Sequence, residues 1–204
     1  MAKILAVRQS QLPPPRPGYD LVVWPTENLG SPAHLRSWAG WSESAILVGD
    51  LSQGALMGYT ARAQDWPGTD LAVGLGKVWG FQNHYIAWLQ EADLRVPEIA
   101  RALSLAGVSL IIAVTSRWPT PFLDPLWRTV QANQLFGLAL GPCPALYSPC
   151  ELDSQESGVI PLQETGGNLF LEVVFERLEV VRKAVPIQQG LRPHLYKTHY
   201  WWTS

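Results

Sequence analysis

Apolar residues fall into short unbroken runs along the chain. Such runs are typical of strands that are buried on both faces of a sheet. Segments that open with proline or aspartate, which favour a helix start, separate several of the runs. The predicted strands lie at 3–7, 19–25, 44–49, 110–114 and 134–140, the helices at 31–40, 99–106 and 124–133, and loops at 64–76 and 141–149. Strands and helices mixed in this way indicate an α/β fold with enough strands for two sheets.

The stretch from 78 to 114 predicts a strand, a short acidic turn, a helix and a second buried strand. The first strand lies within 78–89, and Glu91 stands at the pivot of the turn that follows it. Pro97 suits the first turn of the next helix, and Gly107 suits its end. This arrangement displays a side chain at the carboxyl end of a strand, so Glu91 is a candidate functional residue.

The composition is that of a folded domain of ordinary size. Of the 204 residues, 47% are hydrophobic and 16% are charged, which argues against disorder. The formal net charge is -2 and the chain has no dense basic cluster, so we expect no nucleic-acid partner. The apolar runs are too short to span a bilayer, and Arg8 interrupts the N-terminus too early for a signal peptide. We therefore expect a cytoplasmic protein without a membrane partner, in which 1–204 form a single domain and 190–204 its aromatic C-terminal tail.

Metal and cofactor motifs are missing from the sequence. Cys143 and Cys150 form no CxxC pair, and the four histidines lack the spacing of a zinc site. Gly74 and Gly76 are too few for a dinucleotide-binding loop. We therefore expect no metal and no cofactor, and we interpret the two cysteines as thiols of a proline-rich loop rather than as a relocated nucleophile.

Four segments of the chain resemble the carbon–nitrogen hydrolase superfamily, which includes nitrilases, amidases and N-carbamoylases. They follow the family's order and span most of the sequence: 20–27, 93–107, 127–137, and 171–182 with 191–196. The second is similar to the family's nucleophile elbow and its helix. The last is similar to the closing strand, short helix and Arg-Pro-x-Leu-Tyr tail. The resemblance implies a four-layer α-β-β-α sandwich, here with shortened loops.

The chemistry of this family needs a cysteine nucleophile, a glutamate base and a lysine that steadies the oxyanion. Glu91 stands where the resemblance places the cysteine, either as a catalytic group with new chemistry or as a turn residue left after the nucleophile was lost. The glutamate should follow Pro25 directly, but Thr26 is there. Glu27 comes one place later, where it either reaches the pocket through a bulge or remains a loop acid. Lys77 is the only plausible lysine, and it is otherwise an exposed hairpin residue.

The resemblance leads to two hypotheses about function. The first is a catalytically inactive homologue with a binding or structural role, for example as the partner of an active enzyme. The alternative is a hydrolase of amide-type or nitrile-type carbon–nitrogen bonds that works through a rearranged site of Glu27, Glu91 and Lys77. The resemblance also implies a homodimer formed through the elbow helix 99–106 and the tail from 191, and it leaves room for a small-molecule ligand.

Overall fold

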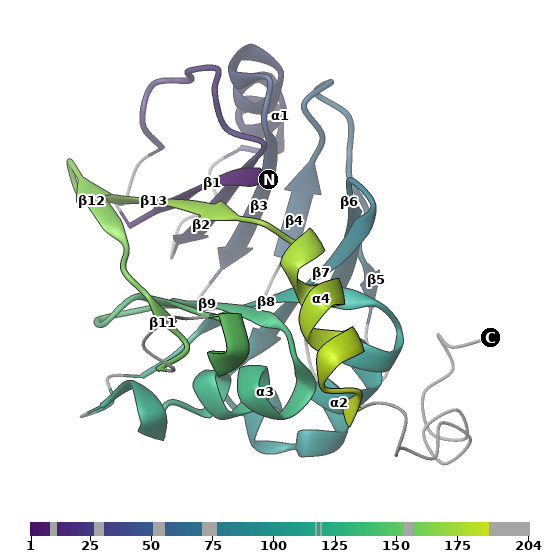
Figure 1. Cartoon of the computed structure of the whole chain (residues 1–204). Coiled ribbons are helices and arrows are strands. Elements are labelled where there is room, and N and C mark those ends of the chain that lie inside the picture. Colours follow the sequence, from purple (N-terminus) through teal and green to yellow (C-terminus); the bar gives the residue numbers. More distant parts are fainter. Residues whose placement is uncertain are drawn as a thin grey trace. The chain divides into compact units, whose positions relative to one another are not determined.

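Strands and helices follow one another along the chain as the apolar runs predict. The computed structural model describes residues 1–8, 12–26, 31–50, 56–70, 77–116, 118, 120–152 and 157–187. Within these residues the strands form two mixed sheets, accompanied by four α-helices (Figure 1). The chain divides into two units, residues 1–69 with 162–174 and residues 70–161 with 175–204. The predicted α/β fold with two sheets is confirmed.

The six-stranded sheet has the order β12-β13-β1-β2-β3-β4. Strands β1, β2 and β3 are parallel neighbours, whereas β13 and β4 pair antiparallel with the outer members of this trio. The trio is the buried centre of the sheet, as its continuous apolar runs predict. The strand bounds are β1 (Ala2–Val7), β2 (Leu21–Thr26), β3 (Ala45–Asp50), β4 (Leu56–Tyr59), β12 (Gln163–Thr165) and β13 (Asn168–Val173).

Helix α1 (Pro32–Ser42) begins at the serine and proline that predict it. Ser31 is the N-cap, and its Oγ accepts a hydrogen bond from the backbone N–H of His34 at 3.1 Å. Leu35 and Trp38 lie on the buried face of the helix and belong to the apolar core of the first unit. The cap therefore fixes where the helix starts, and the buried face fixes how it packs.

The seven-stranded sheet has the order β11-β10-β9-β8-β7-β6-β5. Strands β7, β8 and β9 run parallel, and their carboxyl ends therefore meet at one edge of the sheet. The candidate site lies at this edge. The strand bounds are β5 (Thr69–Asp70), β6 (Lys77–Phe81), β7 (His84–Gln90), β8 (Val108–Val114), β9 (Phe136–Leu140), β10 (Ala145–Tyr147) and β11 (Val159–Ile160).

Helices α2 (Pro97–Leu105) and α3 (Pro125–Asn133) pack on the same side of strands β8 and β9 (Figure 1). Their apolar residues share one core with alternate residues of the strands. A fully buried Leu or Ile side chain contributes about 1.5–3 kcal/mol, so this core holds both helices firmly against the sheet. Its leucines and isoleucines that are no more than 1% exposed are Leu89, Ile99, Leu103, Ile111, Leu126 and Leu135.

The last helix, α4 (Glu176–Ala184), forms hydrogen bonds near the amino ends of the parallel strands β8 and β9. Nη2 of Arg182 donates to the carbonyl oxygens of Val108 at 3.3 Å and Gln134 at 3.1 Å. The guanidinium thereby satisfies backbone acceptors next to the starts of β8 and β9. This contact lies at the end of the strands opposite to Glu91.

The structure corrects three details of the predicted elements. The segment 78–89 contains the predicted strand, β7, and in addition most of its hairpin partner β6, because the chain turns at Gln82, which has a φ of 53°. The predicted loops at 64–76 and 141–149 contain the short strands β5 and β10. Both strands are recognisable only through their pairing with a neighbour, which a local sequence pattern does not reveal.

Glu27 and the tail from 191 lie outside the described residues, and so the predictions that concern them stay predictions. None of the helices in the described ranges is both long enough and apolar enough to cross a membrane.

Candidate functional site

The segment after β7 has the strand–turn–helix form that the sequence predicts. β7 ends at Gln90, Glu91 follows, and a 3-10 turn, η1 (Asp93–Arg95), leads into α2. Asp93 is buried and fixes the turn, because its Oδ2 accepts a hydrogen bond from the backbone N–H of Gln90 at 3.1 Å. Glu91 therefore lies at the carboxyl end of β7.

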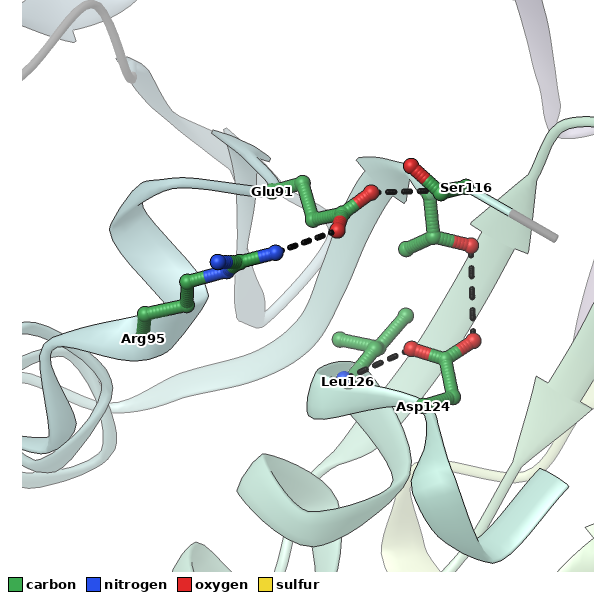
Figure 2. Close-up of polar contacts among 6 residues, drawn as sticks. Glu91, Arg95, Ser116, Asp124 and Leu126 are labelled. Atoms are coloured by element: carbon green, nitrogen blue, oxygen red, sulfur yellow. Dashed lines mark hydrogen bonds and ion pairs between the residues drawn. The ribbon is translucent and has the colours of Figure 1, made fainter. Parts of the chain in front are cut away.

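Both carboxylate oxygens of Glu91 have partners (Figure 2). Oε2 accepts a hydrogen bond from the backbone N–H of Ser116 at 2.5 Å, and Oε1 lies 3.2 Å from Nη2 of Arg95. Ser116 follows β8, the parallel neighbour of β7, so the sheet brings together residues that are 25 positions apart. The side chain of Glu91 is only 17% exposed, whereas that of Arg95 is 65% exposed. Arg95 thus closes the site on its solvent side.

These contacts favour the ionised form of Glu91. Burial acts to raise the pKa, but the hydrogen bonds from Ser116 and the hydrogen bond and charge of Arg95 together outweigh it. The pKa of Glu91 therefore lies below its ordinary value of 4.5. At neutral pH the residue is a carboxylate that is held in place by two donors.

A second carboxylate, Asp124, lies in the buried layer next to this pair. It is 2% exposed and caps α3, because its Oδ1 accepts from the backbone N–H of Leu126 at 2.8 Å. Its Oδ2 accepts from the hydroxyl groups of Tyr147 at 3.0 Å and Thr115 at 3.3 Å. Thr115 directly precedes Ser116, so the two carboxylates hold adjacent residues at the end of β8 (Figure 2).

The protonation of this buried cluster differs from that of Glu91. Burial raises the pKa of Asp124, and its three hydrogen bonds only partly offset that effect; the charge of Glu91 raises it further. Burial and the neighbouring Asp124 carboxylate also raise the pKa of Tyr147, which stays a neutral hydrogen-bond donor. The site therefore has one accessible, firmly ionised carboxylate and one inner carboxylate that resists ionisation.

Lys77 lies at the same edge of the sheet as Glu91. It opens β6 and pairs in the antiparallel ladder with Trp88, near the carboxyl end of β7. Its side chain is half-buried rather than exposed. The partners of Glu91 in the described part of the chain are nevertheless Arg95 and Ser116. The strand register brings Lys77 to the edge where Glu91 lies, without placing it in the contacts of the carboxylate.

Sequence reasoning missed Arg95, Ser116 and Tyr147 as parts of the site, and it identified Asp124 only as a helix cap. The spacing of Glu91 and Arg95, four residues apart, was a usable signal for an ion pair. Ser116 and Tyr147 carried no such signal, because they reach the site through strand pairing.

Of the two cysteines, Cys143 lies close enough to the inner cluster to contribute, after burial and Asp124, to the raised pKa of Tyr147. Cys143 is exposed and Cys150 is half-buried, in the segment that follows β9. In the described ranges, no three His, Cys, Asp or Glu side chains are grouped so that they could hold a metal ion. The ionisable groups that contact one another in the site are thus Glu91 with Arg95 and Asp124 with Tyr147.

Comparison with known proteins gives a match in structure but not in sequence. No protein-family model and no curated protein matches the sequence. Nit3 from Saccharomyces cerevisiae, a member of branch 10 of the nitrilase superfamily, is 13% identical with a TM-score of 0.64, over 93% of this chain and 97% of that one. An amidase from Nesterenkonia sp. is 13% identical with a TM-score of 0.58, over 97% and 95% of the two chains.

A third similar structure is a carbon–nitrogen hydrolase from Helicobacter pylori G27. It is 13% identical with a TM-score of 0.58, and the likeness covers 88% of this chain and 85% of that one. All three likenesses extend over most of both chains. The resemblance drawn from the sequence is therefore confirmed at the level of the fold: the chain is a divergent protein with the α/β fold of the nitrilase superfamily.

Proposed function

We propose that this protein is a catalytically inactive homologue of nitrilase-fold hydrolases, with a binding or structural role. The observation that carries the proposal is the position of Glu91, its ionised form and its two contacts. This residue occupies the turn between β7 and α2, and its carboxylate is ionised and bound to Ser116 and Arg95.

A similar structure indicates what the same fold does when it is active. A variant of the amidase from Nesterenkonia sp. carries the acetamide moiety of fluoroacetamide, covalently added at its active-site cysteine. The resemblance of the elbow segments places Glu91 at the corresponding turn of this chain. A thiolate is an intrinsically strong nucleophile, whereas a carboxylate is a poor one toward amides. Replacing cysteine with glutamate therefore removes the group that would form the covalent bond.

Glu91 is also poorly suited to act as a general base. A base works best when its pKa lies near the operating pH, and the contacts of Glu91 shift its pKa in the opposite direction. Each of its carboxylate oxygens already accepts a hydrogen bond, which weakens it further as a proton acceptor.

The position expected for the family's glutamate base supports the same proposal. Thr26, the last residue of β2, directly follows Pro25 and is buried. A threonine hydroxyl is far less basic than a carboxylate at neutral pH, so Thr26 does not replace a glutamate in proton transfer. Thr26 and Glu91 are each a departure from the residue that the resemblance leads us to expect, and the loss of one catalytic member usually removes most of the activity.

The other expectations from the resemblance extend this proposal. The protein is expected to work as one carbon–nitrogen hydrolase-like domain in the cytoplasm, and to form a homodimer through the elbow helix and the tail. The apolar side chains of α2 are buried in its own core. Any contribution of this helix to a dimer would therefore come from Pro97, Glu98 and its other uncovered residues.

The test compares wild-type protein with Glu91→Gln and Glu91→Cys variants on amide, nitrile and carbamoyl substrates. We expect no turnover from any of the three, because Glu91→Cys restores only the nucleophile. Intact-mass analysis after incubation with fluoroacetamide should show an adduct at position 91 in the cysteine variant only.

Wild-type turnover that Glu91→Gln abolishes would overturn the proposal in favour of a rearranged hydrolase with Glu27, Glu91 and Lys77. Stoichiometric wild-type labelling at Cys143 or Cys150, accompanied by turnover, would overturn it in favour of a relocated nucleophile.

A further inference from the structure

A proline-rich segment lies between β1 and β2, and the candidate site makes no use of it. Residues 12–18 contain four of the chain's prolines, Pro13, Pro14, Pro15 and Pro17. A proline ring fixes its own φ at about −65° and moves the residue before it to an extended conformation. Because a proline or a residue before a proline occupies every position of 12–17, the sequence favours a polyproline II conformation there.

The exposure of the segment follows the repeat of this conformation. A polyproline II helix has about three residues per turn, so residues three positions apart share an edge. Pro14 and Pro17 share one edge, and both are exposed. Leu12 and Pro15 share another, both are half-buried, and Leu12 packs against the apolar core of the first unit. The segment therefore keeps one edge against its own unit and presents Pro14 and Pro17 to solvent.

Contacts on both sides of the exposed prolines hold the segment in place. The carbonyl oxygen of Pro13 accepts a hydrogen bond at 2.8 Å from Nε1 of Trp38 on α1, beside which the segment runs (Figure 1). At the other end, the ring of Tyr19 lies 5.7 Å from that of Phe170, and the carbonyl oxygen of Tyr19 accepts from Oγ of Ser44 at 2.8 Å. A segment that is already ordered loses little conformational entropy when it binds a partner. These anchors therefore suit the exposed edge to recognition by another molecule.

The exposed edges leave two kinds of polar group for a partner. In the described part of the chain, the carbonyl oxygens of Pro14 and Pro17 accept no hydrogen bond. Arg16 occupies the third edge and is exposed, and no carboxylate of the described residues pairs with it. A partner that fits this surface would thus combine hydrogen-bond donors with a negative charge.

A hollow of about 210 Å³ lies next to the segment. Pro14 and Arg16 line it, together with Trp38 and Phe170. Clefts that bind small molecules have volumes of about 300–1,000 Å³, so this hollow is small for a ligand of that kind. The exposed edge of the segment, rather than the hollow, is the candidate for recognition.

We propose that residues 12–17 bind a groove of another protein that is lined by aromatic side chains and has a carboxylate at its rim. SH3 and WW domains recognise proline-rich segments in polyproline II conformation through aromatic-lined grooves of this kind. Pro14 and Pro17 pack against the aromatic rings of the groove, and Arg16 pairs with the carboxylate. Tyrosine hydroxyl or tryptophan N–H groups of the groove donate to the carbonyl oxygens of the segment.

This interaction is independent of the candidate site. The segment belongs to the first unit, whereas Glu91 and the elbow helix belong to the second. The inference therefore does not rest on the proposed loss of catalysis. A homodimer formed through the elbow helix would also leave the edge of Pro14 and Pro17 unused.

The test uses the full chain, immobilised for biolayer interferometry, and an array of purified SH3 and WW domains as the probe. Each domain of the array has a carboxylate beside its aromatic groove. Pro14→Ala and Pro17→Ala remove the exposed prolines, and Arg16→Glu reverses the charge. Pro15→Ala is the matched control for the prolines, because it makes the same change on the half-buried edge. Arg62→Glu is the matched control for the charge, because Arg62 is an exposed residue of the same unit.

We expect domains of the array to bind the wild-type chain, and Pro14→Ala, Pro17→Ala and Arg16→Glu each to weaken binding about tenfold or more. The two control variants should bind like wild type. Circular dichroism and urea unfolding establish that all five variants are folded.

The proposal is overturned if no domain binds, if the three variants of the exposed edges bind like wild type, or if a control weakens binding as much as the variant that it matches. It is also overturned if sedimentation shows a wild-type dimer that Pro14→Ala and Pro17→Ala dissociate, because the segment would then contact a second copy of the chain. The loss of catalysis is tested separately by turnover, and none of these results bears on it.

Discussion

Replacement of Asp124 with alanine tests the physical argument for the site most directly. The carboxylate accepts three hydrogen bonds, from Leu126, Tyr147 and Thr115, and thereby connects α3, β10 and the end of β8. Alanine removes both acceptor oxygens, and with them all three hydrogen bonds, without adding volume. The surrounding donors are buried, and water cannot simply replace the lost oxygen atoms.

The expected loss of stability follows from two of these contacts. Loss of an N-cap side chain costs about 1 kcal/mol. Tyr147 is 2% exposed, and a buried hydroxyl left without its partner costs about 1–3 kcal/mol. The free energy of unfolding should therefore fall by about 2–4 kcal/mol for Asp124→Ala. In a chain of this size, such a loss lowers the melting temperature by roughly 10 °C.

The assay is urea unfolding followed by circular dichroism at neutral pH, with Asp124→Asn as the control. Asparagine retains an oxygen that can cap α3, and the hydroxyl groups of Tyr147 and Thr115 can accept from its amide. Because asparagine also avoids the burial of a charge, we expect Asp124→Asn to change stability by less than about 1 kcal/mol. A double-mutant cycle with Tyr147→Phe should show that the loss in Asp124→Ala is partly shared between the two residues.

Two results would refute this reasoning. If Asp124→Ala unfolds like wild type, the three hydrogen bonds do not hold the end of β8 and the start of α3 together. If Asp124→Asn costs as much as Asp124→Ala, the charge of Asp124 matters more than its acceptor geometry, and the effect of burial on its pKa has been misjudged.

Two further predictions concern Glu91 and the packing of α3. Since the folded-state pKa of Glu91 is lowered, its ionised form stabilises the fold above about pH 4.5, and this contribution is lost as the pH falls through the folded-state value. The difference in free energy of unfolding between wild type and Glu91→Gln, measured by urea unfolding from pH 7 to pH 3, should therefore become smaller at acidic pH. A difference that does not change with pH would contradict the lowered pKa. A Cβ at Gly137 would lie 2.6 Å from Cγ2 of Val130, so Gly137→Ala should cost about 1–3 kcal/mol by overpacking α3 against β9. Gly80→Ala is the strand control, because its Cβ would meet only Tyr85 at 3.8 Å, and equal losses in the two variants would show that overpacking is not the cause.

The sequence predicted the elbow well because each of its parts is determined locally. The apolar run of β7, the first-turn proline of α2 and the glycine at its end are independent signals that agree. Gly107 has a φ of 91°, a conformation that glycine adopts readily. Asp124 was likewise predicted as the N-cap of α3, because capping depends on residues adjacent in the chain.

The predictions that failed depended on strand pairing. The residues of β5 and β10 have no pattern that distinguishes them from loop, and they become strands because a neighbour offers unpaired backbone groups. The strand that leads into the elbow was predicted within 78–89, but the turn that separates β6 from β7 was not located, because Gln82 gives no strong turn signal even though it adopts a positive φ. Resemblance to a family supplied the candidate positions, but it did not reveal what surrounds them.

The α/β fold, the elbow and the glutamate at its pivot could all be predicted from the amino-acid sequence. These follow from hydrophobic runs, helix starts and residue identity, which act over a few neighbouring positions. The contacts of Glu91 could not be predicted in this way, because parallel pairing of β7 with β8 brings Ser116 to it from 25 residues away. That pairing, together with Arg95, makes the residue a fixed and ionised carboxylate rather than a free acid on a loop. The charge state of a side chain depends on burial and on nearby donors, and these exist only once the sheet has formed.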